Sequence, residues 1–241
     1  MLTARGVTVE RGPLRLSVAE FRVAAGELHV LCGRNGAGKS TWLETLAGLI
    51  EPLTGEIRCL EGPSRPPAVA FLPARAEDAL LGARRALEVE LTLALRGEPA
   101  TRAEELGAEI DRLLDLPREG SDCRAERLYR VLYGLLATGA RTLLLDEPTA
   151  RVTPDARQWL YRSLGRLREA GYALVAATHD PELARRADVL WRAEAGRLVR
   201  DDLVSAVADG VLRAPQPGGL LPGIVSLRAD LDGALRALVR P

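Results

Sequence analysis

The chain has 241 residues with 33 basic and 33 acidic side chains, so its formal net charge is zero. That balance argues against a protein that binds nucleic acid through a basic surface. Lys39 is the only lysine, so every other basic residue is an arginine. With 47% hydrophobic and 27% charged residues, the composition is ordinary for a globular domain and supplies enough apolar material for a core.

Two further classes are not supported by the sequence. No apolar run reaches the roughly 18 residues that a membrane-spanning helix needs, and the N-terminus MLTARGVTVERG contains no apolar signal segment. We therefore expect a cytoplasmic chain that meets a membrane only through a partner. Cys32, Cys59 and Cys123 are odd in number and far apart, which favours small buried hydrophobes over a disulfide framework or a zinc site.

The first 30 residues carry short apolar runs that alternate with Gly and charged residues, which predicts antiparallel strands. GELHVLC at 26–32 then predicts a buried strand that leads into a glycine-rich turn. From Ser40 to Ile50 the apolar residues recur at helical spacing, and the Pro and Gly of EPLTGE are typical of a helix stop.

The middle third changes to a helical pattern, which predicts a helical subdomain at 74–137 inserted into a core formed by 1–73 and 138–200. Thr101 is the expected cap of a helix with an apolar face that includes Leu106 and Ile110, and Pro117 is expected to end it. REGSD at 118–122 is expected to be a loop.

The last third returns to strands that alternate with helices. TLLLDEP at 142–148, a helix opened by Thr153 and Pro154, and YALVAATHD at 172–180 indicate parallel βαβ units. The predicted fold class is therefore α/β, with a mixed or parallel sheet, N-terminal antiparallel strands and a helical insertion. Residues 201–241 form a C-terminal tail without an assigned role, which includes the Pro/Gly-rich stretch RAPQPGGLLPG.

The glycine-rich turn fits the phosphate-binding pattern GxxxxGK[ST] at each fixed position. In this pattern the glycines turn backbone N–H groups toward an anion, the following helix adds its positive end, Lys39 reaches the β- and γ-phosphates, and the Ser40 hydroxyl ligates Mg²⁺. A flexible glycine turn is the alternative, but the loop lies between a buried strand and an amphipathic helix. The expected nucleotide-binding residues are Gly33, Arg34, Asn35, Gly36, Ala37, Gly38, Lys39, Ser40 and Thr41.

Three more polar residues follow buried strands and are expected at the same sheet edge. Asp146 follows three leucines, so it is placed to hold the Mg²⁺ shell, and Glu147 to orient a water for attack on the γ-phosphate. Without the phosphate loop, a helix-capping acid pair would be the simpler interpretation. His179 follows the next apolar strand and is expected to contact the γ-phosphate, whereas His29, within a strand, is interpreted as structural.

GRNGAGKST, LLLDEPTA and AATHD, in this order and with a helical insert between the first two, resemble the ATP-binding subunit of an ATP-binding cassette (ABC) transporter. The resemblance covers about residues 1–200 and implies a P-loop ATPase with ATP and Mg²⁺ as ligands. FLPARAEDALLG at 71–82 is similar to a stretch in energy-coupling-factor importers. The resemblance also implies a second ABC ATPase subunit and integral membrane transporter subunits as partners, no nucleic acid, and a peripheral place on the cytoplasmic face of the cell membrane.

The sequence departs from the family at four places. Arg11 stands where an aromatic residue usually stacks on adenine, so we expect it to meet the nucleotide through its guanidinium plane. Ala74 replaces the coupling glutamine and Thr153 the usual aspartate after DEPT. The segment 123–127, CRAER, replaces the "LSGGQ" signature that grips the γ-phosphate of the partner's ATP.

The retained motifs all serve the chain's own nucleotide, while the most altered one serves the partner's. The hypothesis is an asymmetric dimer in which this chain's ATP is hydrolysed if a different subunit supplies an intact signature. The alternative is a non-transport nucleotide-binding regulator with little or no hydrolysis, which the loss of the glutamine favours.

Overall fold

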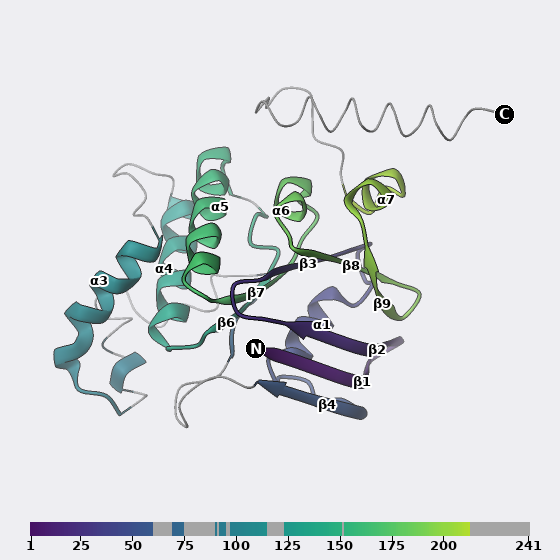
Figure 1. The fold of residues 1–241 in the computed structure, drawn as a ribbon, viewed down its shortest axis with the longest axis horizontal. Helices are drawn as coiled ribbons and strands as arrows, with labels where there is room; N and C mark the ends of the chain where they lie inside the picture. Colours follow the sequence, from purple (N-terminus) through teal and green to yellow (C-terminus); the bar gives the residue numbers. More distant parts are fainter. Residues whose placement is uncertain are drawn as a thin grey trace.

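A computed structural model describes residues 1–59, 69–74, 90, 92–94, 97–114, 123–150 and 152–212. Its strands form one sheet in the order β4-β1-β2-β9-β8-β3-β7-β6-β5 (Figure 1). The strands are β1 Leu2–Arg11, β2 Leu14–Val23, β3 Leu28–Gly33, β4 Thr54–Cys59, β5 Val69–Leu72, β6 Thr142–Asp146, β7 Ala173–Ala177, β8 Val189–Glu194 and β9 Arg197–Asp201. The helices are α1 Lys39–Leu46, α3 Ala103–Leu114, α4 Cys123–Ala137, α5 Pro154–Glu169, α6 Pro181–Arg185 and α7 Leu203–Ala208, with a 3₁₀ turn η2 at Ala100–Arg102.

The N-terminal strands pair antiparallel, as predicted. β1 and β2 form a hairpin in which Arg11 lies opposite Leu14, and β4 adds to the other side of β1. Gly12 in the turn has a φ of 57°, a left-handed conformation that favours glycine. This unit extends the sheet beyond β9.

The central strands β8, β3, β7, β6 and β5 run parallel, which confirms the predicted mixed sheet. Their side chains alternate between two buried layers because successive residues of a strand point to opposite faces. On β6, for example, Leu143 and Leu145 face one layer and Leu144 the other. A strand buried on both faces explains the unbroken apolar runs in the sequence.

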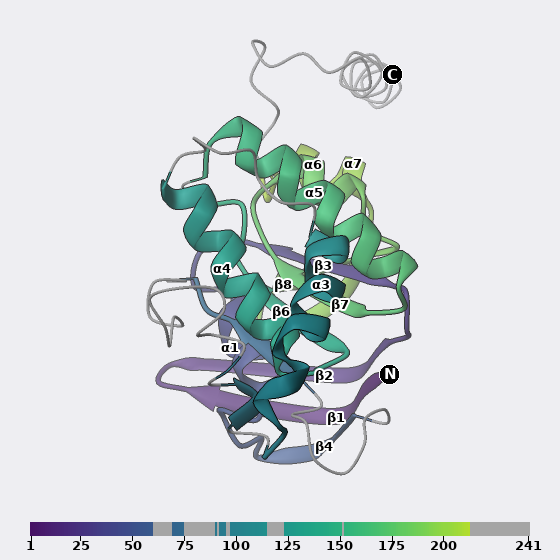
Figure 2. The ribbon, with the colours of Figure 1, turned by 90° about the vertical axis from the view of Figure 1, so that its left-hand side faces the viewer.

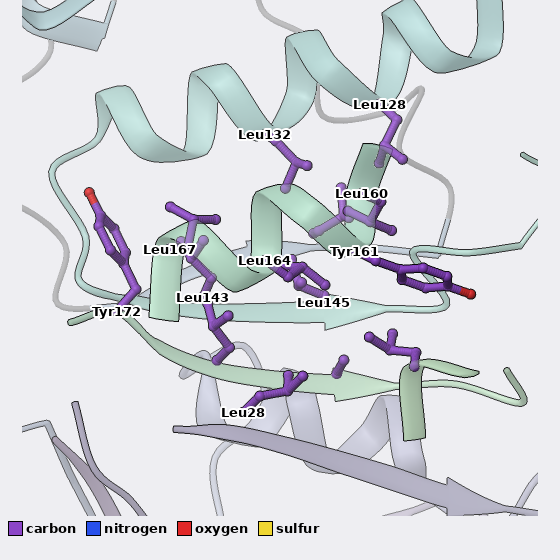
Figure 3. Close-up of a cluster of buried hydrophobic side chains, with 14 of the residues drawn as sticks. Leu28, Leu128, Leu132, Leu143, Leu145, Leu160, Tyr161, Leu164, Leu167 and Tyr172 are labelled. Atoms are coloured by element: carbon purple, nitrogen blue, oxygen red, sulfur yellow. The ribbon is translucent and has the colours of Figure 1, made fainter. Parts of the chain in front are cut away.

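Helices cover both faces of the sheet. Figures 1 and 2 show α3, α4 and α5 together on one side and α1 on the other. In Figure 3, leucines of α4 and α5 point toward Leu28 of β3 and toward Leu143 and Leu145 of β6. On the opposite face, Trp42 and Leu43 of α1 are completely buried against the sheet.

The helical part of the middle third is confirmed where the structure describes it. Ile110 and Leu114 of α3 are buried, and α5 holds the end of α3 because Trp159 Nε1 and Ser163 Oγ donate to the Leu114 carbonyl at 2.7 and 2.8 Å. The expected cap at Thr101 is wrong by one residue, since Thr101 belongs to η2 and α3 begins at Ala103, directly after Arg102. Pro117 and the loop at 118–122 lie outside the described residues.

Two other predicted boundaries are wrong. The helix expected to reach Ile50 ends at Leu46, because Gly48 takes a φ of 76°, and Leu49 is 66% exposed instead of buried. The break placed after residue 200 falls within β9. Ala206 and Leu212, at and beyond α7, are buried in the core, so the core extends at least to Leu212.

Other expectations can be compared directly. Thr153 caps α5 by accepting from the Ala156 N–H, and His29 is buried, as expected. Cys32 is buried and Cys59 partly so, while the side chain of Cys123 and residues 213–241 lie outside the described part. Within the described ranges, no helix is long and apolar enough to cross a membrane.

Candidate nucleotide site

The glycine-rich loop joins the end of β3 to the start of α1, and three of its positions have backbone conformations that favour glycine. Gly33 has a φ of 152°, and a Cβ there would lie 2.7 Å from the backbone carbonyl oxygen of Ala193. Gly36 and Gly38 have φ values of 80° and 102°. Gly38 is also the residue that precedes the first turn of α1, so the loop turns directly into the positive end of a helix.

Lys39 points back over this loop and is only 7% exposed. Its Nζ donates to the Gly33 carbonyl at 2.8 Å and to the Arg34 carbonyl at 3.4 Å, and it lies 3.2 Å from Nε2 of His179. Burial lowers the pKa of Lys39, and the carboxylates of Glu147 and Asp146 oppose that shift. Backbone carbonyls and the His179 ring hold the ammonium group, and no carboxylate of the described residues forms an ion pair with it.

Asp146 ends β6 and is 5% exposed. Burial raises its pKa, which a hydrogen bond from Ser40 and the charge of Lys39 counteract. Its Oδ1 atom is buried and accepts no hydrogen bond from the described part of the chain. Because a buried carboxylate oxygen normally has a partner, this atom and the Ser40 hydroxyl are suited to a hard cation that prefers oxygen ligands.

Glu147 follows directly and has a left-handed backbone, with a φ of 48°. Its N–H donates to the Ala177 carbonyl at 2.8 Å, which ties the end of β6 to the end of β7. Burial raises the pKa of Glu147, while a positive charge on His179, the charge of Lys39 and a hydrogen bond from the His179 backbone act in the opposite direction. Its Oε1 lies 3.6 Å from Nε2 of His179. A left-handed backbone is uncommon for a glutamate, and residues in such conformations cluster at functional sites.

His179 joins these groups. Its Nε2 lies 3.0 Å from the amide oxygen Oδ1 of Asn35, in addition to the contacts with Lys39 and Glu147. Three segments that are far apart in the sequence thus meet at one sheet edge. The structure brings together Asn35, Lys39, Ser40, Asp146, Glu147 and His179, as the sequence motifs predict.

Arg11 lies at the end of β1 and forms an ion pair with Glu44 of α1, with its side chain 56% exposed. The structure thus places it near the first helix, while its stacking on a base stays a prediction. Ala74 is exposed just after β5. Residues 123–127 form the first turns of α4, and their side chains lie outside the described residues.

Sequence reasoning missed two features of the site. Glu44 was not singled out as the partner of Arg11, although it lies one helical turn after Ser40. The Val211 carbonyl lies 3.4 Å from Nδ1 of His179, and no sequence motif marks it.

A glycine loop that leads into a helix, with a lysine, a buried acid pair and a histidine at the carboxyl ends of parallel strands, defines a P-loop nucleotide-binding protein. The profile of the family described as "ABC transporter" matches residues 16–150. The chain therefore belongs to the ABC transporter ATP-binding family.

Individual relatives agree with that assignment. The chain is 34% identical over 198 residues to the cytochrome c biogenesis ATP-binding export protein CcmA of Rhizobium meliloti, covering 75% of this chain and 91% of the relative. It is 30% identical over 238 residues to the ribose import ATP-binding protein RbsA 2 of Rhizobium etli, covering 88% of this chain. That match spans only 46% of the relative, so the chain corresponds to about half of its length.

Solved structures show the same fold. The structure of CbiO1 from Clostridium perfringens, described as part of the ABC transporter complex CbiONQ, matches with a TM-score of 0.71 at 17% identity. The match covers 87% of this chain and 91% of the other. The predicted P-loop fold with N-terminal antiparallel strands is thereby confirmed.

Proposed function

We propose that this chain is the ATP-binding subunit of a transporter and that it binds and hydrolyses Mg-ATP to drive transport through separate integral membrane subunits. The observation that carries the proposal is the convergence of Lys39 and Glu147 on His179. Lys39 Nζ lies 3.2 Å from His179 Nε2, and Glu147 Oε1 lies 3.6 Å from the same atom. Family membership and the names of the relatives support it.

The proposal assigns phosphate binding, Mg²⁺ binding and proton transfer to different residues. Lys39 and the loop N–H groups of residues 33–41 bind the β- and γ-phosphates, and Ser40 with Asp146 hold Mg²⁺, which when bound neutralises phosphate charge. Glu147 accepts a proton from water as the water oxygen bonds to the γ-phosphorus and the bond to the oxygen shared with the β-phosphate breaks. A raised pKa makes Glu147 a stronger base than an exposed glutamate.

His179 contacts the γ-phosphate and aligns it between Lys39 and Glu147. Arg11 lies against the nucleotide base. This requires either that its ion pair with Glu44 opens or that the guanidinium plane turns toward the base while the pair is kept. Both assignments are part of the proposal.

The proposed assembly is a dimer with a second ABC ATPase subunit, attached to membrane subunits at the cytoplasmic face of the cell membrane. The altered 123–127 segment lacks the glycines and serine that would bind the γ-phosphate of the partner's ATP. ATP hydrolysis is therefore slow at the partner's site. Loss of a single preorganised donor to a transition-state anion typically costs about 2.7–4 kcal/mol, so loss of a whole set nearly silences a site.

Two measurements test the proposal. Titration of the chain with ATP in the presence and absence of Mg²⁺ should show Mg²⁺-dependent binding that Asp146→Asn weakens. Isolation of the chain from detergent-solubilised membranes should bring integral membrane subunits with it. Recovery of the chain alone, or with soluble proteins only, would support the regulatory alternative.

A further inference from the structure

The segment that follows α7, residues 209–212, lies against the nucleotide site and is here called the C-terminal strap. Val211 N and Leu212 N both donate to the Ala206 carbonyl, at 3.0 and 2.9 Å, which folds the strap back on the end of α7. Val211 is 8% exposed and Leu212 1%, and both belong to the core cluster. The strap is thus fixed by its own backbone and by burial.

The strap also forms one wall of a hollow beside the phosphate loop. A cleft of about 500 Å³ is lined by Arg34 and Ala37 on the loop side and by Asp209 and Val211 on the strap side. Arg192 of β8 completes that wall and forms an ion pair with Asp209. The loop that binds phosphate and the C-terminal strap therefore face each other.

The contacts of His179 assign its protons from both sides of the ring. The Lys39 ammonium has donors only, so a hydrogen bond between it and Nε2 at 3.2 Å needs a lone pair on Nε2. The atom of Asn35 that lies 3.0 Å from Nε2 is the amide oxygen Oδ1. A lone pair on Nε2 therefore requires the Asn35 amide to turn by 180°, which brings its NH₂ group to the ring. Glu147 Oε1, 3.6 Å from Nε2, is beyond hydrogen-bond distance. Nδ1 must then carry the proton of the neutral ring, and the Val211 carbonyl is its acceptor at 3.4 Å.

We infer that the C-terminal strap is a positioning element of the nucleotide site: the Val211 carbonyl holds His179 as the Nδ1–H tautomer, which turns a lone pair on Nε2 toward Lys39. Together with the Gly33 carbonyl, this lone pair keeps the lysine ammonium over the phosphate loop before nucleotide arrives. The inference deepens the proposed function.

The chain contains an internal reference for testing this assignment. It has two histidines, and His29 has the opposite pattern of contacts. The indole Nε1–H of Trp191, which can only donate, points to Nδ1 of His29 at 3.1 Å. The proton of His29 is therefore on Nε2, which lies 3.2 Å from Glu27 Oε2. One spectrum should show the two histidines as opposite tautomers.

The test is long-range ¹H–¹⁵N correlation NMR on the ¹⁵N-labelled, nucleotide-free chain at neutral pH, with His179→Gln used to assign the signals. We expect His179 as the Nδ1–H tautomer and His29 as the Nε2–H tautomer. An Nε2–H tautomer or a doubly protonated ring at His179 would overturn the inference. Because no nucleotide is present, that result would leave the proposed ATP binding untouched, and absence of ATP binding would leave this result untouched.

Matched variants then test the strap itself. Gly210 has a φ of 67° and open space around it, and so does Gly171, with a φ of 83°, at the other end of β7. Gly210→Ala should shift the His179 ring toward the Nε2–H tautomer that free imidazole prefers, while Gly171→Ala should leave it unchanged. An unchanged His179 signal in Gly210→Ala, or an equal change in both variants, would contradict a role of the strap.

Two shortened chains provide a second comparison. A chain that ends after Leu212 keeps the strap and should keep the His179 tautomer and the ATP affinity. A chain that ends after Ala208 loses the acceptor. It should show mixed tautomers, and its ATP affinity should fall roughly 2- to 10-fold, the effect of one hydrogen bond. Should the shorter chain not fold, the intact-chain spectrum and the glycine pair still decide the question.

Discussion

Lys39→Arg isolates what a lysine does at this site, because it keeps the positive charge and changes only the shape of the head group. The ammonium fits among the Gly33 and Arg34 carbonyls and the His179 ring, with Nζ at 2.8, 3.4 and 3.2 Å from its partners. A planar guanidinium is larger and has its donors in a fixed fork, so it cannot occupy a space that is 7% exposed and already filled.

The expected loss follows from the hydrogen bonds to phosphate. Each hydrogen bond to a charged group contributes about 1.5–3 kcal/mol, so two such bonds, one to each terminal phosphate, are together worth about 3–6 kcal/mol. ATP affinity should therefore fall roughly 10²- to 10⁴-fold in Lys39→Arg. Lys39→Met, which removes the charge as well, should lose at least as much.

Calorimetric titration with Mg-ATP measures this loss, and thermal unfolding without nucleotide supplies the control. Burial lowers the pKa of Lys39, so its charge costs folding stability at neutral pH, and Lys39→Met should unfold no lower than the unmodified chain. Lys39→Met should thus lower the ATP affinity without lowering the thermal stability of the nucleotide-free chain. An Arg variant that binds ATP within threefold of the unmodified chain would refute the proposed role of the ammonium.

Three other predictions follow from the same geometry. Burial raises the pKa of Asp146 and Glu147, so the folded chain binds more protons than the unfolded chain above the ordinary values of 3.8 and 4.5. Without nucleotide, the stability of the folded chain should therefore fall as the pH rises through the raised pKa values. Asp146→Asn should reduce this fall, as measured by melting temperatures between pH 5 and pH 8. An equal dependence of melting temperature on pH in both proteins would contradict the prediction. Gly33→Ala should weaken ATP binding and lower the melting temperature more than Gly48→Ala, because both φ values are positive but only Gly33 has a carbonyl 2.7 Å from the new Cβ. Leu145→Ala should cost about 2–5 kcal/mol in urea unfolding, since Leu145 is completely buried between β6 and the helices, and a cost below 1 kcal/mol would show that the site collapses around the cavity.

The motif residues could be placed from the sequence because each follows a buried strand. The three leucines before Asp146 and the ALVAA run before His179 predict parallel strands, and their carboxyl ends must meet at one sheet edge. The structure confirms that meeting for Lys39, Glu147 and His179. Local chemistry was sufficient here, since glycine tolerates the positive φ values that the loop requires.

One feature was missed for a local reason, and the others depend on contacts between distant segments. The end of α1 is set by Gly48 in a left-handed conformation, although the apolar spacing continues to Ile50. The contact between Val211 and His179 uses a backbone carbonyl, which any residue supplies, so no residue type marks it. The ion pair of Arg11 with Glu44 joins a strand to a helix that only the folded sheet brings close.

The central proposal is that the site formed by this chain's phosphate loop hydrolyses ATP, whereas the site that holds the partner's ATP against the 123–127 segment does not. The most direct test reconstitutes the chain with its partner subunit and compares Glu147→Gln with the matching substitution in the partner, with ATP turnover as the measurement. The account predicts that Glu147→Gln removes most of the turnover and that the partner's substitution leaves it nearly unchanged. Unchanged turnover in Glu147→Gln would contradict the account.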